Sequence, residues 1–585
     1  MTKLSKILLV MILSLTTVFV SCSKSTDTTS AAKGESQSAV GTDPVEKEAP
    51  AVDEQAEVTK AVSNMVALAD VENFVIPTED EVQRGGAFVI SNGTEPESLD
   101  PHLIQGEPEH RLNYAFFEGL VENDPKSSNA IPGLAKSWEV SDDATVITFH
   151  LRKSNWSDGT PLTTKDVVYS WKRELDPATA SPYAWFPEMF LKGAAEYAKG
   201  EISADELGFK ALDDYTLQVT LVGPLPYAVP AFAHYSFGIV PEHCIEEYGD
   251  QWTHPGSMVS NGPFLLSEHV AQSYVEGVRN ENYWDADNVY LDSVRFLASD
   301  DSNTNYNMYI AGDLDWLPAI STEQMDSAQM SNDFQSGPQL ATAYYVIQCN
   351  DSVLNNTLVR QALSYAVDRD SMVDNVTKGN QIPAWGMVPP MSGYDALEFP
   401  FDSYVEACEI AQGKMTEAGY PNGIGFPKIT LLYNSNESNK KVAELLQANY
   451  KSVLGIDCTL ENQEWGTFLQ NRNQGSFQLA RSGWVGDYQD PNTFLDQFLT
   501  GAAMNGGHFE NSKYDSLIRK ASTMPAGPAR FEVLNEAENI LVNENQATIP
   551  FYFYSSGNLV DTEKWGGWYT NTMNYHPLKS IYLKK

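Results

Sequence analysis

The chain has 585 residues, of which 38 are Lys or Arg and 78 are Asp or Glu, so its formal net charge is −40. That charge argues against a nucleic-acid-binding protein and against electrostatic adhesion to anionic lipid, because both need clustered basic side chains. With 42 % hydrophobic and 11 % aromatic residues, most of the chain should fold, and its length allows roughly three to five domains or lobes.

The first 22 residues predict export. Lys3 and Lys6 precede an apolar run, Ile7 to Val20, that is too short and too interrupted to span a membrane and is typical of a signal peptide. The run ends in the letters FVSC, and a small residue followed by cysteine resembles a bacterial lipobox. We therefore predict a lipoprotein signal peptide at 1–21 and acylation of Cys22 by palmitate-like chains, which would hold the protein on a membrane. An ordinary signal peptide with an incidental cysteine is the alternative.

Residues 22–83 are predicted to form a flexible acidic tether. No aromatic residue precedes Phe74 in this segment, which is rich in Ser, Thr, Ala, Asp and Glu and cannot bury enough apolar surface to fold. Removal of residues 1–21 loses two lysines and takes the net charge to −42. No membrane-spanning run follows, so we expect an extracytoplasmic, lipid-anchored protein on the periplasmic or cell-surface face of a bacterial membrane.

From Arg84 onward the pattern is mixed α/β. Alternating, β-branched segments predict strands, and apolar residues at helical spacing predict helices. The predicted strands are GGAFVISNG (85–93), ATVITFHLR (144–152), DDYTLQVTLV (213–222), IDCTLENQEW (456–465) and ATIPFYFYSS (547–556). The predicted helices are TTKDVVYSWKREL (163–175), with a threonine cap, and residues 356–376, 438–455 and 529–546.

Signatures of enzyme chemistry are absent from the sequence. There is no G-x-S-x-G, H-E-x-x-H or phosphate-binding glycine loop, and the nine histidines lack metal-ligand spacing. We therefore predict no enzyme activity, no metal and no cofactor. The remaining cysteines form no CxxC pair, and buried free thiols are favoured over two disulfides; they are Cys244, Cys349, Cys408 and Cys458.

Aromatic residues stand beside polar turn residues in two late segments. These segments are QEWGTFLQNRNQGSF (463–477) and SGWVGDYQDPNTF (482–494). Aromatic side chains in such surroundings more often line a cleft than a core, because they supply contact area at low entropic cost. The pattern predicts a binding protein.

Several long segments resemble, in order, the family 5 extracytoplasmic solute-binding proteins, the peptide-binding components of ABC importers. They are SNGTEPESLDPHLIQGEPE (91–109), GLAKSWEVSDDATVITFHLRKSNWSDGTPLTTKDVVYSWKREL (133–175), SNGPFLL (260–266), NTLVRQALSYAVDRD (356–370) and RSGWVGDYQDPNTFL (481–495). The resemblance runs from about Arg84 to Lys585. It implies an α/β, two-lobed, hinged fold of the type II periplasmic-binding-protein kind with an extra α/β domain.

The resemblance also implies the boundaries and the partners. Lobe I would comprise 84–117, 242–340 and 556–585, the additional α/β domain 118–241, and lobe III 341–555, with hinge crossings near 340 and 555. An oligopeptide would bind between lobes I and III, which then close. The other partners would be a membrane-embedded ABC permease with its ATPase subunits, and the protein itself would be a monomer.

The site residues follow from the same resemblance, motif by motif. In the family, the aspartate of the G-W-x-x-D-Y motif binds the peptide ammonium, and that residue here is Asp487, although a turn role is its simplest reading from composition. The other expected ligand-binding residues are Gly483, Trp484, Arg481, Tyr183, Asn261, Trp465, Leu469, Arg472, Tyr344 and Glu107.

Some positions depart from the family pattern. Glu107 stands where an apolar residue is usual, and Asn473 stands where a histidine is found, so the preferred peptide length stays open. For Trp465 and Tyr344, a place in the core is the alternative. Three other functions also remain open: binding of another solute (a dipeptide, nickel chelate, haem or oligosaccharide), a surface adhesin or peptide-signal receptor, and, least favoured, an enzyme.

Overall fold

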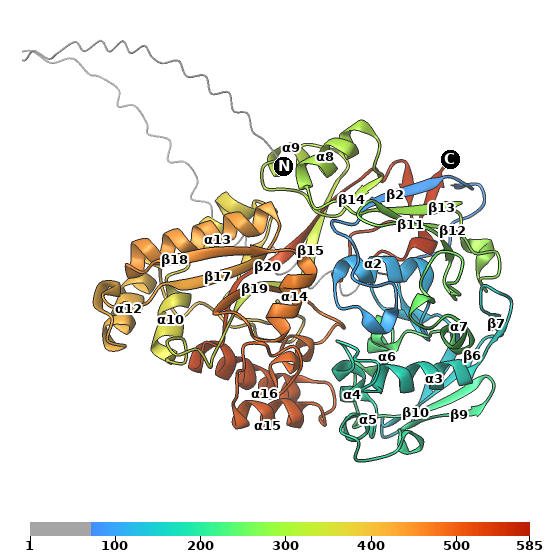
Figure 1. Ribbon diagram of the computed structural model, residues 1–585, viewed down its shortest axis with the longest axis horizontal. Helices are drawn as coiled ribbons and strands as arrows, with labels where there is room; N and C mark the ends of the chain where they lie inside the picture. Colours follow the sequence, from blue (N-terminus) through green and yellow to red (C-terminus); the bar gives the residue numbers. More distant parts are fainter. Residues whose placement is uncertain (1–71) are drawn as a thin grey trace, which may run out of the picture. The chain divides into compact units, whose positions relative to one another are not determined.

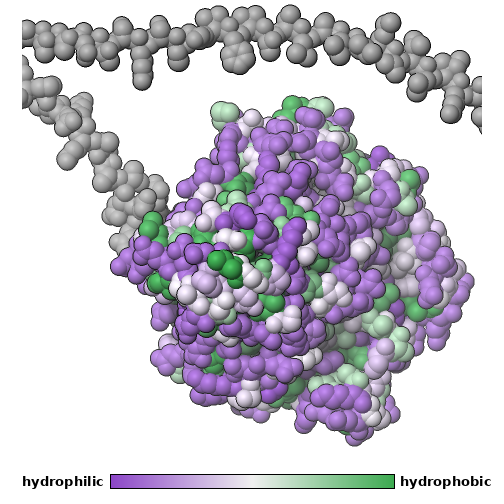
Figure 2. Space-filling view, turned by 60° about the vertical axis from the view of Figure 1, so that its left-hand side comes forward, coloured by the Kyte–Doolittle hydropathy of each residue, from purple (hydrophilic) through white to green (hydrophobic). Residues whose placement is uncertain are grey.

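The computed structural model describes residues 72–585 (Figure 1). The signal peptide, Cys22 and most of the predicted tether lie outside the described residues. Within 72–585, no helix is long and apolar enough to cross a membrane. The four cysteines of this range are free thiols, but only Cys244 and Cys458 are buried as expected, and Cys349 and Cys408 are partly exposed. The face seen in Figure 2 is mostly hydrophilic with small, scattered apolar patches.

An eleven-stranded mixed sheet organises the described chain. Its outer parts contain parallel strand pairs, β2 with β13 at one end and β17 with β18 at the other. The strands, in their order across the sheet, are β11 (Phe264–Val270), β12 (Tyr274–Arg279), β13 (Ser293–Leu297), β2 (Ala87–Ser91), β14 (Trp316–Leu317), β20 (Thr548–Val560), β15 (Phe334–Ile347), β19 (Leu479–Val485), β17 (Ile429–Asn434) and β18 (Cys458–Gln463), with β16 (Ile382–Pro383) beside β20.

Two long antiparallel strands, β15 and β20, run side by side through the middle of this sheet (Figure 1). Their register is interrupted between Pro338 and Thr342, opposite Ser555 and Phe553. Proline cannot donate to a strand ladder, so a break at this point is expected. The interruption coincides with the two predicted hinge crossings, while the domain boundaries themselves stay a prediction.

A separate four-stranded antiparallel sheet lies within residues 118–241, in the order β5 (Ala135–Val140), β6 (Val146–Leu151), β10 (Thr216–Thr220) and β9 (Phe209–Asp213). Helix α3 (Thr164–Leu175) contacts β9, and its Trp171 stacks on Phe232 at 5.5 Å. The predicted threonine cap is present: Thr163 and Asp166 form a capping box at the start of α3.

The helix predicted at 356–376 is interrupted in the structure. Helix α10 (Thr357–Tyr365) ends early, and the chain restarts as α11 (Arg369–Ser371) and a π-helical turn, η6 (Met372–Thr377). The break occurs because extended Asp368 caps the second helix, its carboxylate accepting from the Ser371 N–H at 2.9 Å. The predicted helices at 438–455 and 529–546 form as α13 (Glu437–Asn449) and α16 (Pro528–Asn539), each extended by a π-helical turn.

Candidate functional site

A cavity of about 450 Å³ lies between elements of predicted lobes I and III and the small domain. Its walls come from the start of α2 (Glu107–Phe116), from α14 (Trp465–Asn473), and from β19 and the loop that follows it. Nine of the expected residues line it: Glu107, Tyr183, Trp465, Leu469, Arg472, Arg481, Gly483, Trp484 and Asp487.

Asp487 follows the last residues of β19 and is held there by Thr493. The Asp487 N–H and the Trp484 Nε1–H both donate to Thr493 Oγ1, at 3.0 and 3.4 Å. The next turn is fixed by Asp490, which forms a buried ion pair with Arg530 at 2.7 Å. These contacts fix the backbone of the short loop that carries Asp487. The Asp487 carboxylate is therefore held in a defined position at the cavity wall.

The Asp487 carboxylate is buried and contacts neutral groups. Its side chain is 7 % exposed, accepts from Tyr183 Oη at 3.3 Å, and lies 3.3 Å from His234 Nε2. Burial lowers the pKa of His234 to about 3, so that ring carries no charge at neutral pH. Burial also raises the pKa of Asp487 to about 8, with hydrogen bonds from Tyr183 and Thr493 opposing the shift. A carboxylate in this setting lacks the cation that buried charges normally require.

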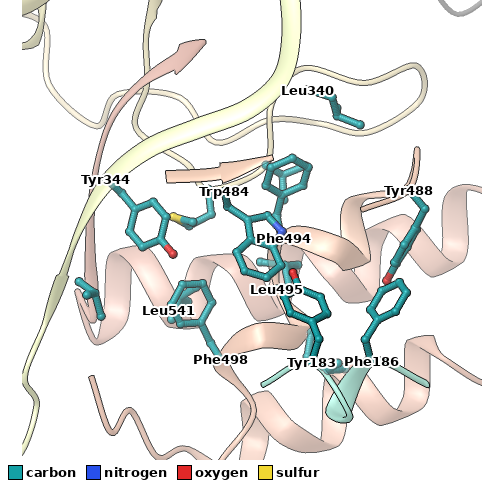
Figure 3. Close-up of a cluster of buried hydrophobic side chains, with 14 of the residues drawn as sticks. Tyr183, Phe186, Leu340, Tyr344, Trp484, Tyr488, Phe494, Leu495, Phe498 and Leu541 are labelled. Carbon is teal, nitrogen blue, oxygen red and sulfur yellow. The ribbon is translucent and has the colours of Figure 1, made fainter. Parts of the chain in front are cut away.

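Aromatic rings from two parts of the chain enclose this end of the cavity. Tyr183 and Phe186 approach the side chains of Trp484 and Tyr488 in Figure 3, and the rings of Phe186 and Tyr488 lie 6.0 Å apart. Tyr227 stacks face to face on Tyr488 at 4.5 Å. Aromatic rings therefore surround the few polar contacts of Asp487 and keep the site poor in water, which strengthens any electrostatic contact that the carboxylate makes.

Strand β19 presents an open backbone edge to the cavity. It pairs with β15 over its whole length, but with β17 only at Leu479 and Ala480. From Arg481 to Val485 the second edge has no strand partner among residues 72–585. Gly483 sits on this stretch, and a Cβ there would lie 3.0 Å from Tyr554 Oη. An extended ligand could add its own backbone hydrogen bonds along this edge.

Two arginines of the cavity lack a carboxylate partner among the described side chains. Arg472 donates to Ser482 and Asn473, and Arg481 donates to Tyr554 Oη at 3.0 Å. Burial lowers the pKa of Arg472, although a guanidinium stays charged at neutral pH. Both groups are suited to receive a carboxylate or carbonyl oxygen of a ligand.

Two expected residues do not line this cavity. The amide of Asn261 is used by the backbone of Glu118: Nδ2 donates to the carbonyl at 2.8 Å, and Oδ1 accepts from the N–H at 3.1 Å. Tyr344 is buried against β19, donates to Gln497 Oε1 at 3.1 Å, and lines a smaller neighbouring cavity. The structure thus uses Asn261 to hold the backbone at Glu118, and it places Tyr344 in the wall of the smaller cavity instead of the larger one.

Several lining residues carried no sequence signal. They include His110, Arg111, His234, Tyr235, Asn434 and Tyr575. The histidines looked like any of the nine in the chain, and only the fold brings His234 to Asp487, across more than 250 residues of sequence.

Comparisons with known proteins agree on one family. Residues 129–506 match the bacterial extracellular solute-binding proteins, family 5 (Middle). The chain is 36 % identical over 530 residues to the periplasmic oligopeptide-binding protein OppA of Escherichia coli, covering 89 % of this chain and 95 % of that protein. The crystal structure of OppAIV from Borrelia burgdorferi, a periplasmic oligopeptide-binding protein, is 35 % identical, with a TM-score of 0.82 over 85 % of this chain and 99 % of that one.

A third relative has two conformations for comparison. The murein tripeptide-binding protein MppA of Escherichia coli is 34 % identical, with a TM-score of 0.82 over 87 % of this chain and all of that one. Its unliganded open form gives a TM-score of only 0.62 at the same identity, over 87 % of this chain and 99 % of that one. The arrangement described above therefore differs more from the open form than from the other MppA structure.

Proposed function

The chain belongs to the family 5 bacterial extracellular solute-binding proteins, and on that premise we propose that it captures oligopeptides in this cavity and delivers them to an ABC importer. The observation that supports a peptide ligand is the Asp487 carboxylate, which is buried beside neutral Tyr183 and His234 and has no cation partner among the described residues. A free peptide supplies the missing group, its terminal ammonium.

The rest of the cavity suits the rest of a peptide. Peptide amides must be matched when they leave water, and the open edge of β19 from Arg481 to Val485 offers backbone donors and acceptors for them. Main-chain bonds do not depend on ligand side chains, which explains how such a site would tolerate many sequences. Arg472 and Arg481 would receive oxygens toward the carboxyl end, and Trp465, Leu469 and Trp484 would wall the side-chain pockets.

Capture would proceed by closure of the two lobes about β15 and β20. Several contacts join the two sides in the described conformation, including Asn473 Nδ2 to Gln105 Oε1 at 2.8 Å and the ion pair of Lys441 with Glu323 at 3.1 Å. Such contacts would break on opening, so each favours the closed state. The permease and its ATPase subunits would then accept the ligand, and acylated Cys22 would keep the monomeric protein at the membrane.

The proposed role is binding and release without chemistry. A surface peptide-signal receptor would use the same cavity, but it would leave peptide uptake unchanged when its gene is deleted. An enzyme would alter its ligand, which mass spectrometry of incubated peptides would detect. Reduced uptake together with intact peptide would support the transport role over both.

Native mass spectrometry of the full-length purified protein, followed by calorimetry on ligand-stripped protein, tests the proposed ligand class. We expect co-purified masses that fragment as short peptides. We also expect that a free-amine peptide binds at least about 100-fold more tightly than its N-acetyl analogue, because acetylation removes the ammonium from a buried ion pair. Equal affinity for the two, or a co-purified solute without peptide bonds, would refute the proposal.

A further inference from the structure

Glu107 is a second, half-buried cavity carboxylate for which residues 72–585 provide no hydrogen-bond or ion-pair partner. It is the first residue of α2, follows the cap Gly106, and lines the same cavity as Asp487. No hydrogen bond from a described residue reaches its carboxylate, and its charged neighbours are Arg111 and Asp487. Burial raises the pKa of Glu107 to about 7, with Arg111 opposing the shift and Asp487 adding to it.

Arg111 lies one turn further along α2, but its guanidinium is engaged elsewhere. It donates to the backbone oxygen and the side-chain oxygen of Asn92, at 3.3 and 3.1 Å, and lies over the ring of Trp316 at 5.4 Å. Arg111 therefore lowers the cost of a charge on Glu107 without forming an ion pair with it. Glu107 remains free to bind another cation.

Some buried carboxylates of the described chain do have a cation partner. Asp100 contacts Arg173 at 2.6 Å, and Glu118 contacts Lys579 at 3.0 Å. These pairs hold the fold together, since leaving a buried charge uncompensated is costly. Buried carboxylates without a cation are satisfied by hydrogen bonds instead, as Glu538 is by Tyr394 Oη and the Met387 N–H, both at 2.7 Å. Glu107 has neither kind of partner among the described residues, and it borders the ligand cavity.

The cavity wall holds more acidic than basic side chains. Three arginines face four carboxylates, and burial keeps the pKa of both lining histidines low enough for them to stay neutral. The carboxylates are Glu107, Asp300, Glu464 and Asp487, and the arginines are Arg111, Arg472 and Arg481. Burial raises the pKa of Glu107 to about 7 and that of Asp487 to about 8, so each carboxyl group is stabilised in its ionised form only when a ligand cation lies against it. The terminal ammonium of a peptide supplies one such cation, and a basic side chain supplies a second.

We propose that Glu107 binds a second cation of the ligand, so that this site prefers peptides with a lysine or arginine side chain among their first three residues. This inference rests on the proposed function, because Asp487 must hold the terminal ammonium for Glu107 to meet a side chain near it. The aromatic faces of Tyr235 and Tyr575, which also line the cavity, add a favourable surface for a cation.

Calorimetry on the full-length chain tests the proposal with two sets of tetra-alanine peptides. One set carries lysine at position 1, 2 or 3, and the other carries norleucine, which has a similar length and no charge. We expect lysine to bind at least about tenfold more tightly than norleucine at one of these positions. In Glu107→Gln that preference should fall below about twofold, with norleucine peptides binding as in the wild type.

Asp300→Asn is the matched control, because it also removes one cavity carboxylate but should keep the lysine preference. Lysine no better than norleucine at all three positions would overturn the inference. A lysine preference that survives in Glu107→Gln would also overturn it. So would an equal loss of affinity for lysine and norleucine peptides in that variant, because one terminal ammonium would then be contacting both Glu107 and Asp487. Failure of the proposed function looks different: the wild type would then bind none of the peptides.

Discussion

Asp487→Asn is the most direct test of the proposed site, because it keeps the size of the side chain and removes its charge. The carboxyl group is 7 % exposed, and its contacts, Tyr183, His234 and Thr493, are all neutral. A ligand ammonium would therefore supply a cation that no residue within 72–585 supplies. Removing one partner of a buried ion pair costs about 3–5 kcal/mol.

When a peptide binds, the wild type does not gain the full value of about 3–5 kcal/mol that removing one partner of the ion pair costs. Because burial raises the pKa of Asp487 to about 8, most of the carboxyl group is protonated at pH 7 and must lose that proton to pair with an ammonium. One pH unit corresponds to about 1.4 kcal/mol. The expected net loss in Asp487→Asn at pH 7 is about 1.6–3.6 kcal/mol, or roughly 15- to 450-fold in Kd.

The assay is calorimetry with a short peptide between pH 6 and 9. Wild-type affinity should rise toward pH 8, by at most about tenfold per pH unit, because the free protein binds a proton that the complex lacks. It should fall above pH 8, where the ligand α-amino group loses its own proton. In Asp487→Asn, peptide affinity should no longer increase between pH 6 and 8, but it should still decrease above pH 8. Wild-type-like affinity in the variant, or an unchanged rise, would refute the assigned role.

The remaining predictions concern closure, the strand edge, the anchor and stability. Asn473→Ala removes the bond to Gln105, worth about 0.5–1.5 kcal/mol, so stopped-flow fluorescence should show roughly two- to twelvefold faster ligand dissociation; an unchanged rate would count against closure through this contact. Gly483→Val places a side chain against Tyr554 and should raise Kd at least about tenfold in calorimetry, with native circular dichroism; undiminished binding would exclude the β19 edge as the ligand site. Cys22→Ala should move the protein from the membrane to the soluble fraction, and persistent acylation would disprove the lipobox. Without ligand, Asp487→Asn should have a higher melting temperature than the wild type at pH 8, and this difference should shrink toward pH 4. The reason is that a carboxyl group whose pKa is higher in the folded than in the unfolded state destabilises the wild type as the pH rises. Equal melting temperatures at pH 8 would contradict the raised pKa of Asp487.

Local patterns predicted local structure well. The Thr163 cap and the strands at 85–93 and 144–152 depend on neighbouring residues, so the sequence contains what is needed to infer them. The break at Asp368 was missed because apolar spacing continues on both sides of it, and only a side-chain bond to Ser371 shows that the helix restarts.

The site was harder to predict where its parts come from distant segments. The G-W-x-x-D-Y motif located Asp487, but no pattern near His234 indicates that it lies 3.3 Å from that carboxylate. Asn261 is a position where the motif and the contacts in the structure suggest different roles. Its position in a family segment suggested ligand contact, whereas the fold uses both ends of its amide to fix the backbone of Glu118.

The neutral partners of Asp487 also explain how ligand and closure would be coupled. Closing the lobes on an empty cavity buries a carboxylate that only Tyr183, His234 and Thr493 contact, which disfavours the charged form and the closed state together. On the proposed function, a ligand ammonium would remove that penalty, and it would do so only when both sides of the cavity are in place. A ligand shifts a two-state equilibrium only by its difference in affinity for the two states, and at the proposed site that difference would arise at Asp487. Contacts such as Asn473 with Gln105 can then stay individually weak, because they complete a closure that the ion pair has made favourable.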